Sequence, residues 1–372
     1  MTAVRYPWAL EEFKRQNFDI IVEEGRKELH AQRAKIAGDA GLLKLADITL
    51  RAAFMLRDVA AAEELLSIVG GLSPLAHFAA GMQFYIDQHR DAWFHLANTS
   101  PYRPDYHGYW SLGLNSVVRS QDWPVYSQSN QFGSRRRVYG YDGVVTGGKD
   151  YAVVFSCDRG YFKRFFEGCI AGLRRTCANF VAYFYVVEPD DECKAMMRQY
   201  QADDVAFLIE DKPERVGDKS YFASARFFAA ADTIERTALP VLVLDIDIAV
   251  QDDLSALCYP SSIGLKRSAF SEKIACRFMS GLVLPWHLIV ANAMYVPANA
   301  TGRMFLDLVC RYIGHIYDRS TDERLWWIDQ NALFFAYCAS NADGFEKLGE
   351  RRLEKSIKFP KMFQNKDRAL SP

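Results

Sequence analysis

The sequence predicts an α/β domain, with a mixed and mainly parallel sheet covered by helices on both faces, that follows an all-α N-terminal domain. Three observations predict this fold. Apolar runs alternate with helix-like segments from Tyr151 onward, the preceding part of the chain has helical spacing, and a segment rich in glycine separates the two patterns. We therefore expect a helical domain over residues 1–131, a linker over 132–150 and an α/β domain over 151–372.

Composition and charge exclude several classes of protein. The chain has 372 residues, half of them hydrophobic, and a formal net charge of −1. A chain of this size has room for one large or two medium domains, and its near-neutral charge gives no support for binding nucleic acid. The eight cysteines contain no Cys-x-x-Cys pair, so they read as reduced, buried thiols.

We expect neither a signal peptide nor a transmembrane segment in this sequence. The N-terminus lacks an apolar signal core, and the longest weakly polar stretch, Phe278 to Ala300, contains Pro285 and Pro297. Two buried strands explain that stretch better than a membrane span. The expected location is the cytoplasm, with the inner membrane surface as an alternative.

The helical region contains a weak internal repeat of about thirty residues. Leu45–Phe54 aligns with Leu75–Phe84, Ala61–Leu66 aligns with Asp91–Leu96, and a third, poorer copy begins near Tyr109. Helix pairs of this length resemble tetratricopeptide-like repeats, with an ordinary helical bundle as the alternative. Such a domain is expected to bind an acceptor or a protein partner.

The α/β part is read from its apolar runs and their flanking turn residues. Arg135-Arg136-Arg137, just before it, is interpreted as a solvated part of the linker. The predicted strands are 151–156, 180–187, 205–209 and one that begins at Val241, and the predicted helices are 162–177, 191–201 and 221–236.

The strand that begins at Val241 carries two aspartates, Asp245 and Asp247. Side chains two residues apart share one face of a strand, and adjacent carboxylates repel unless a proton or cation lies between them. Mg²⁺ and Mn²⁺ prefer such oxygen ligands, and Mg²⁺ is commonly held by carboxylates together with substrate phosphates. The alternative is a strand that leaves the core with Asp in the next turn, but Ile246 and Ile248 keep this segment apolar.

A third carboxylate is expected near this pair. Asp158 follows the first predicted strand, and ligands bind beyond the carboxyl ends of strands in parallel sheets. The sequence therefore predicts a metal–diphosphate site at that edge of the sheet.

From Tyr151 to about Lys366 the chain resembles the GT-A nucleotide-diphospho-sugar glycosyltransferases. The resemblance is strongest to the retaining group that contains glycogenin and the bacterial lipopolysaccharide galactosyltransferases. Five landmarks in the right order carry it: Phe155–Tyr161, Lys219–Phe227, Asp245–Asp247, Val290–Val296 and Trp326–Leu333.

The resemblance implies a role for each matching residue. Asp245 and Asp247 would hold Mn²⁺ or Mg²⁺, and Asp329 and Gln330 would be the catalytic pair that lies against the donor sugar. The residues expected to contact the nucleotide-sugar are Ser156, Asp158, Tyr161, Arg226, Asp245, Asn292, Lys361 and Lys366.

Two departures from the family pattern stand out. Met294 replaces a glycine beside the sugar, and the C-terminal segment lacks the histidine that completes the metal shell in the family. Lys361 or Lys366 would instead serve the diphosphate, and Gln364 or Asn365 would offer an oxygen to the metal. The alternative for this tail is a basic surface segment.

The expected function is that of a metal-dependent, hexosyltransferase-like glycosyltransferase, and its retaining stereochemistry is an expectation from the resemblance. It would move a sugar from a nucleoside-diphosphate donor, with UDP as the expected nucleotide, to a glycan, lipid or protein acceptor. One alternative is a non-catalytic scaffold with a degenerate transferase domain. A second, weaker alternative is a haloacid-dehalogenase-like phosphohydrolase, in which Asp245 would be the nucleophile, but the Asp-x-Asp motif should then open the domain.

Overall fold

The computed structural model describes the larger part of the chain, which divides into two compact units. The first unit comprises the residues up to Trp123 together with Met279–Leu288, and the second comprises Pro124–Phe278 and Ile289–Ala369. The described residues are 6–69, 71–99, 112–123, 131–140, 146–213, 215, 218–259, 270–320, 325–340, 342–348 and 350–358.

The first unit is helical, as the sequence predicts. Asp39 shows how one of its helices begins, because the Asp39 carboxylate accepts hydrogen bonds from the backbone N–H groups of Gly41 and Leu42. The main helices are α1 (Pro7–Lys14), α2 (Phe18–Ala31), α3 (Ala40–Leu56), α4 (Val59–Val69), α5 (Ala76–Tyr85) and α6 (His89–Ala97). Short 3₁₀ segments are η1 (Arg33–Gly38), η2 (Ser73–Leu75), η3 (Leu112–Ser116), η4 (Ser120–Asp122) and η6 (Pro285–His287).

The same backbone turn joins the helices of three consecutive pairs. Gln16, Arg57 and Asp87 each adopt a left-handed conformation. In each turn, this residue donates its N–H to the carbonyl three residues before it, and the next residue donates to the carbonyl five residues before it. The turns at Arg57 and Asp87 are separated by the thirty residues of the predicted period, and the tetratricopeptide-like character stays a prediction. The third copy expected from Tyr109 begins outside the described residues.

The first unit includes a segment from the distant part of the sequence, which corrects the prediction of two strands between Phe278 and Ala300. Met279–Leu288 belongs to this unit, where the Trp286 ring is fully buried and stacks on His77 with the ring centroids 5.8 Å apart. Between Phe278 and Ala300, only Ile289–Val296 forms a strand. The segment leaves the sheet because its apolar side chains complete the helical core.

The second unit contains the predicted mixed sheet, with the strand order β3-β2-β1-β4-β7-β6-β8. Its first four strands are parallel, whereas β7 is antiparallel to both β4 and β6. The strands are β1 (Tyr151–Asp158), β2 (Phe180–Val187), β3 (Val205–Glu210), β4 (Val241–Leu244), β6 (Ile274–Phe278), β7 (Ile289–Val296) and β8 (Phe345–Lys347), and β5 (Ala249–Val250) pairs separately with β9 (Ile357–Lys358).

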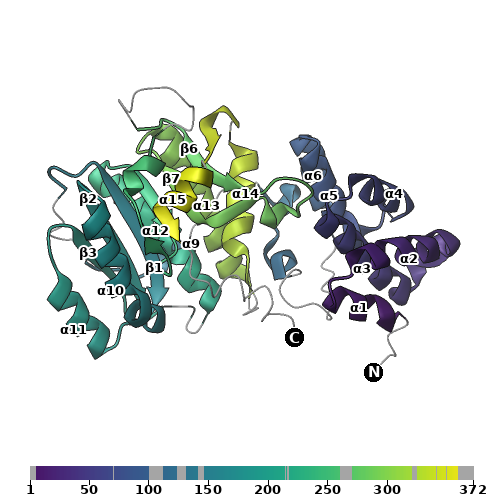
Figure 1. Ribbon diagram of the computed structural model, residues 1–372, viewed down its shortest axis with the longest axis horizontal. Helices are drawn as coiled ribbons and strands as arrows, with labels where there is room; N and C mark the ends of the chain where they lie inside the picture. Colours follow the sequence, from purple (N-terminus) through teal and green to yellow (C-terminus); the bar gives the residue numbers. More distant parts are fainter. Residues whose placement is uncertain are drawn as a thin grey trace. The chain divides into compact units, whose positions relative to one another are not determined.

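Helices cover both faces of this sheet (Figure 1). Alternate side chains of β1 face in opposite directions. Val153 and Phe155 pack with Phe162 of α10 in one apolar cluster, whereas Ser156 hydrogen-bonds the backbone of α12. The helices of this unit are α9 (Gln131–Arg135), α10 (Arg159–Thr176), α11 (Asp191–Tyr200), α12 (Lys219–Thr237), α13 (Ala300–Arg319), α14 (Ile328–Ala339) and α15 (Glu350–Ser356), with 3₁₀ segments η5 (Leu254–Leu257) and η7 (Ala342–Gly344).

The segment predicted as a linker contains packed structure where it is described. Phe132 is buried against the rings of Tyr221 and Tyr317, and Tyr139 exchanges two backbone hydrogen bonds with Ile209 in β3. The interpretation of Arg135-Arg136-Arg137 as wholly solvated is wrong for Arg136, which hydrogen-bonds two buried tyrosines.

Among the described residues, no helix is long and apolar enough to cross a membrane.

Candidate active site at the carboxyl ends of β1 and β4

The two aspartates of the Asp-x-Asp motif lie just beyond the end of β4, in a turn. The expectation that they share one face of a strand is therefore wrong, because β4 ends at Leu244. The Asp245 N–H still donates to the Asn292 carbonyl of β7 over 3.2 Å, after which the chain turns toward β5. Asp247 is only 6% exposed, so this motif places a carboxylate in the interior.

Three predicted site residues lie near one edge of the sheet. Ser156 is near the end of β1, and Asp245 follows the last residue of β4, the strand that pairs with β1. Leu244 pairs with Ala293 of β7, and the hydrogen bond from the Asp245 N–H to the Asn292 carbonyl brings Asn292 beside Asp245. Ser156 bonds the backbone of α12 and Asp245 bonds Arg226 of α12, so both lie on the face that α12 covers.

Arg226 of α12 connects the two halves of the candidate site. Its Nη1 donates to Asp245 Oδ1 over 2.5 Å, and its Nη2 donates to Asp329 Oδ2 over 3.1 Å and to the Ala291 carbonyl over 3.0 Å. The Arg226 side chain is 4% exposed, whereas those of Asp245 and Asp329 are 28% and 14% exposed. The guanidinium therefore lies beneath two carboxylates that reach the solvent.

Asp329 and Gln330, the predicted catalytic pair, lie in the first turn of α14. The preceding Trp327 has a left-handed conformation that begins this helix, and Asp329 Oδ1 accepts the Gln330 N–H over 2.8 Å. Burial raises the pKa of the Asp329 carboxyl, and the Arg226 guanidinium opposes this rise. The structure thus brings Asp329 to Asp245 through Arg226.

Asn292 offers an acceptor to the same region. Its Oδ1 is buried and has no hydrogen-bond partner within the described residues. An unpaired buried acceptor costs free energy that a donor from a ligand would recover.

The residues predicted to hold the nucleotide lie at the end of β1. Ser156 Oγ is 2.5 Å from the Phe222 carbonyl of α12, to which it donates. Asp158 caps α10 by accepting the Tyr161 N–H over 2.8 Å, and the Tyr161 ring is exposed. The structure places all three at the carboxyl edge of the sheet, and their contact with a nucleotide stays a prediction.

The remaining predicted residues fall elsewhere. Lys361 and Lys366, like Gln364 and Asn365, lie outside the described residues. Met294 is fully buried in β7, two residues beyond Asn292.

The described residues fit a metal that takes only part of its ligands from the protein. No group of three or more His, Cys, Asp or Glu side chains able to hold a metal ion occurs among them. The Asp245–Asp247 motif supplies two carboxylates, and Arg226 engages one oxygen of the first. This donor set suits Mg²⁺ or Mn²⁺ whose other ligands are phosphate oxygens and water.

Sequence reasoning missed two parts of this region. The Ala291 carbonyl is a backbone partner of Arg226, and no side-chain pattern announces it. The half-buried Arg136 was missed because three consecutive arginines are usually solvated, although a tyrosine within the apolar run Phe180–Val187 signals a polar contact there.

No family model and no curated protein matches this chain. Solved structures that align with this chain include glycosyltransferases. The glycosyltransferase GlyE of Streptococcus pneumoniae aligns with 55% of this chain at 19% identity and a TM-score of 0.36. The galactosyltransferase LgtC, solved with donor and acceptor sugar analogs, aligns with 54% of this chain at 14% identity and a TM-score of 0.36. Mouse xyloside xylosyltransferase 1 aligns with 54% at 11% identity and a TM-score of 0.32. The alignments cover 46%, 74% and 85% of those chains, so this chain spans less than half of GlyE.

Proposed function

We propose that this protein is a metal-dependent glycosyltransferase that moves a sugar from a nucleoside diphosphate, with UDP as the first nucleotide to test. The arrangement that carries the proposal is the Arg226 bridge between Asp245 and Asp329. It places the Asp-x-Asp motif next to the Asp-Gln pair although about eighty residues separate them in the sequence. A site for a diphosphate and a site for a sugar would thereby adjoin, as transfer of a sugar from a diphosphate requires.

The carboxylates of Asp245 and Asp247 are the residues that would hold the divalent cation. When bound, Mn²⁺ or Mg²⁺ would offset the negative charge that develops on the departing diphosphate. Arg226 keeps Asp245 and Asp329 at fixed positions, because its planar guanidinium donates to both at once.

The sugar would lie between Asp329, Gln330 and Asn292. Asp329 Oδ2 and the unpaired Asn292 Oδ1 are acceptors for sugar hydroxyls. In the retaining reaction that we propose, the bond between the anomeric carbon and the diphosphate breaks. The acceptor oxygen forms the new bond from the same side, and its proton passes to the departing phosphate.

The acceptor is proposed to be a glycan, a lipid or a protein, and the first unit is proposed to recruit it or a protein partner. Two pairs of exposed apolar residues, Met55-Leu56 and Tyr85-Ile86, occupy equivalent positions before the turns at Arg57 and Asp87. Replacement of both pairs by serine should weaken acceptor use and leave donor hydrolysis unchanged. Unchanged use of every acceptor by this variant would contradict the proposed role.

The phosphohydrolase alternative has little support from the order of the elements. The Asp-x-Asp motif should open a haloacid-dehalogenase-like domain, whereas β1, β2 and β3 precede Asp245 in this chain.

A nucleotide-sugar screen tests the proposal. Thermal unfolding would be measured with each nucleoside diphosphate and nucleotide-sugar in the presence of Mn²⁺ or EDTA, because a ligand that binds the native state raises the midpoint. We expect stabilisation by at least one nucleotide with Mn²⁺, hydrolysis of its sugar conjugate, and loss of both in Asp247→Ala. Asp203→Ala, which changes an exposed acid on the loop before β3, is the matched control. If no nucleoside diphosphate stabilises the protein in Mn²⁺, the transferase proposal fails and the scaffold alternative is favoured.

A further inference from the structure

A buried carboxylate on β3 anchors the first turn of the helix that carries Arg226. Glu210, the last residue of β3, is 1% exposed. Its Oε2 accepts hydrogen bonds from the hydroxyls of Tyr185 on β2, over 2.7 Å, and of Tyr221 on α12. Burial raises the pKa of both tyrosines, so that their hydroxyls stay protonated and keep donating.

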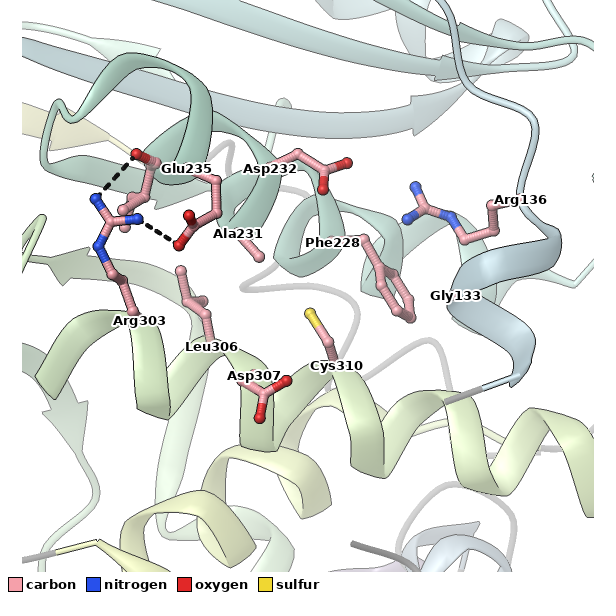
Figure 2. A pocket seen from close by; sticks show the side chains of 11 residues that line it. Gly133, Arg136, Phe228, Ala231, Asp232, Glu235, Arg303, Leu306, Asp307 and Cys310 are labelled. Carbon is pink, nitrogen blue, oxygen red and sulfur yellow. Dashed lines mark hydrogen bonds and ion pairs between the residues drawn. The ribbon is translucent and has the colours of Figure 1, made fainter. Parts of the chain in front are cut away.

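Arg136 closes this network from the segment that follows α9. Its Nη2 donates to the Tyr185 hydroxyl over 2.5 Å and its Nε to the Tyr221 hydroxyl over 3.3 Å. The guanidinium carbon also lies 4.3 Å from the centre of the Phe228 ring. Arg136 and Phe228 line a cavity of about 260 Å³ together with residues of α13. Figure 2 shows the side chains around this cavity.

The network fixes α12 close to the candidate active site. Tyr221 is in the first turn of α12, and Arg226 follows it by five residues. On its other side the same turn accepts a hydrogen bond from Ser156 at the Phe222 carbonyl. A helix whose first turn is held at two points presents its next turn in one orientation.

We propose that Arg136 is a positioning residue for Arg226 and, through it, for Asp245 and Asp329. Arg136 supplies a full positive charge beside a buried carboxylate whose other partners are neutral hydroxyls. Without that charge, we expect the side chains of Glu210 and the two tyrosines to rearrange, because a buried charge needs compensation. The first turn of α12 would then lose one of its two anchors.

Amide hydrogen exchange tests the anchoring without reference to activity. In Arg136→Met, the amides of residues 219–226 should exchange at least about tenfold faster than in the wild type, because local opening becomes easier. Arg136→Lys should be intermediate, since an ammonium group cannot reproduce the planar fork that serves two hydroxyls. The exposed neighbour Arg137→Met is the control and should exchange like the wild type.

A second variant separates positioning from simple loss of folding. Tyr221→Phe removes one hydroxyl from the network and keeps the ring that packs on Phe132 and Tyr317. It should raise exchange over the same residues while the amides of α10 stay protected. Equal exchange over 219–226 in Arg136→Met, Tyr221→Phe and Arg137→Met would overturn the proposal.

The activity part of this inference rests on the proposed function, and its failure can be told apart from failure of that function. If the wild type hydrolyses a nucleotide-sugar, Arg136→Met should lower kcat by about tenfold or more with little change in KM, because misplacement of catalytic groups lowers rates. Arg136→Lys should recover part of the rate. A wild type with no activity would contradict the proposed function. The hydrogen-exchange measurement would still decide whether Arg136 anchors α12.

Discussion

Each unit contains a buried arginine bonded to aspartate, and the two arginines differ in how their charge is balanced. Arg51 of α3 is 1% exposed and bonds Asp47, which is fully buried one turn earlier in the same helix. Arg226 of α12 bonds Asp245 and Asp329, which come from separate elements and reach the solvent. The first arrangement is local, within one helix, whereas the second brings two carboxylates to one arginine at the edge of a sheet.

The difference separates a structural ion pair from a candidate functional one. A pair four residues apart on one helix forms with the helix and needs nothing further. Two carboxylates that share one arginine retain negative charge that a cation can neutralise. The variants below test this contrast.

The largest effect on stability is expected in the first unit. Arg51→Met should lower the free energy of unfolding by about 3–5 kcal/mol, because the fully buried Asp47 would lose a charged partner. The double variant Asp47→Leu/Arg51→Met should recover most of this loss. Urea denaturation measures both, and a double variant no more stable than Arg51→Met would show that the pair is not coupled.

Arg226→Met should lower nucleotide-sugar hydrolysis by about a hundredfold, as is typical when an electrostatic group is removed from an active site. Its effect on stability should be smaller than that of Arg51→Met, because Asp245 and Asp329 remain partly hydrated. Steady-state kinetics and urea denaturation of the two variants, run together, give the comparison. If Arg226→Met is fully active, the bridge has no functional role.

The first unit should also lose stability on mild acidification. Burial, together with the nearby Arg51 charge, lowers the pKa of His77 and of His287 to about 3. Because these folded-state pKa values lie below the unfolded value near 6.5, their contribution is fully present above about pH 6.5 and is lost as the pH falls toward 3. Each histidine should contribute a slope of about 1.4 kcal/mol per pH unit below its unfolded pKa.

Thermal unfolding at pH 7, 6 and 5 checks this slope. His77→Phe should flatten it by about one proton. Identical slopes in the wild type and His77→Phe would contradict the assignment of a buried neutral imidazole.

The smallest effect is expected at Asn292. Its Oδ1 forms no hydrogen bond within the described residues, so Asn292→Val should change stability by less than about 1 kcal/mol. The same variant should bind a nucleotide-sugar about tenfold more weakly, since one hydrogen bond to the sugar is lost. Affinity for the nucleoside diphosphate without sugar is the control, and an equal loss there would place Asn292 outside the sugar site.

The sequence predicted elements well where the pattern was local. The strand Phe180–Val187 was predicted with its observed bounds, because an uninterrupted apolar run between turn residues leaves little choice. The turn that carries Asp245 and Asp247 was not predicted, because apolar residues continue through it and the pairing of β4 with β7 decides where the strand ends.

Long-range features depended on the order of the strands. Asp329 lies close to Asp245 because Arg226 bonds both and because β7 lies between β4 and β6. No local sequence pattern predicts the shared hydrogen bonds or this strand order. Likewise, Met279–Leu288 joins the helical core through Trp286, which only the folded chain reveals.

Titration of Mn²⁺ into the protein, followed by the electron paramagnetic resonance signal of the free ion, tests the central claim most directly. With UDP present, the wild type and the control Asp203→Asn should bind about one Mn²⁺, as expected for a single carboxylate–diphosphate site. Asp247→Asn should bind Mn²⁺ at least about tenfold more weakly, because one charged ligand is lost. Equal Mn²⁺ binding by all three proteins would contradict the claim that the Asp-x-Asp turn is a metal–diphosphate site.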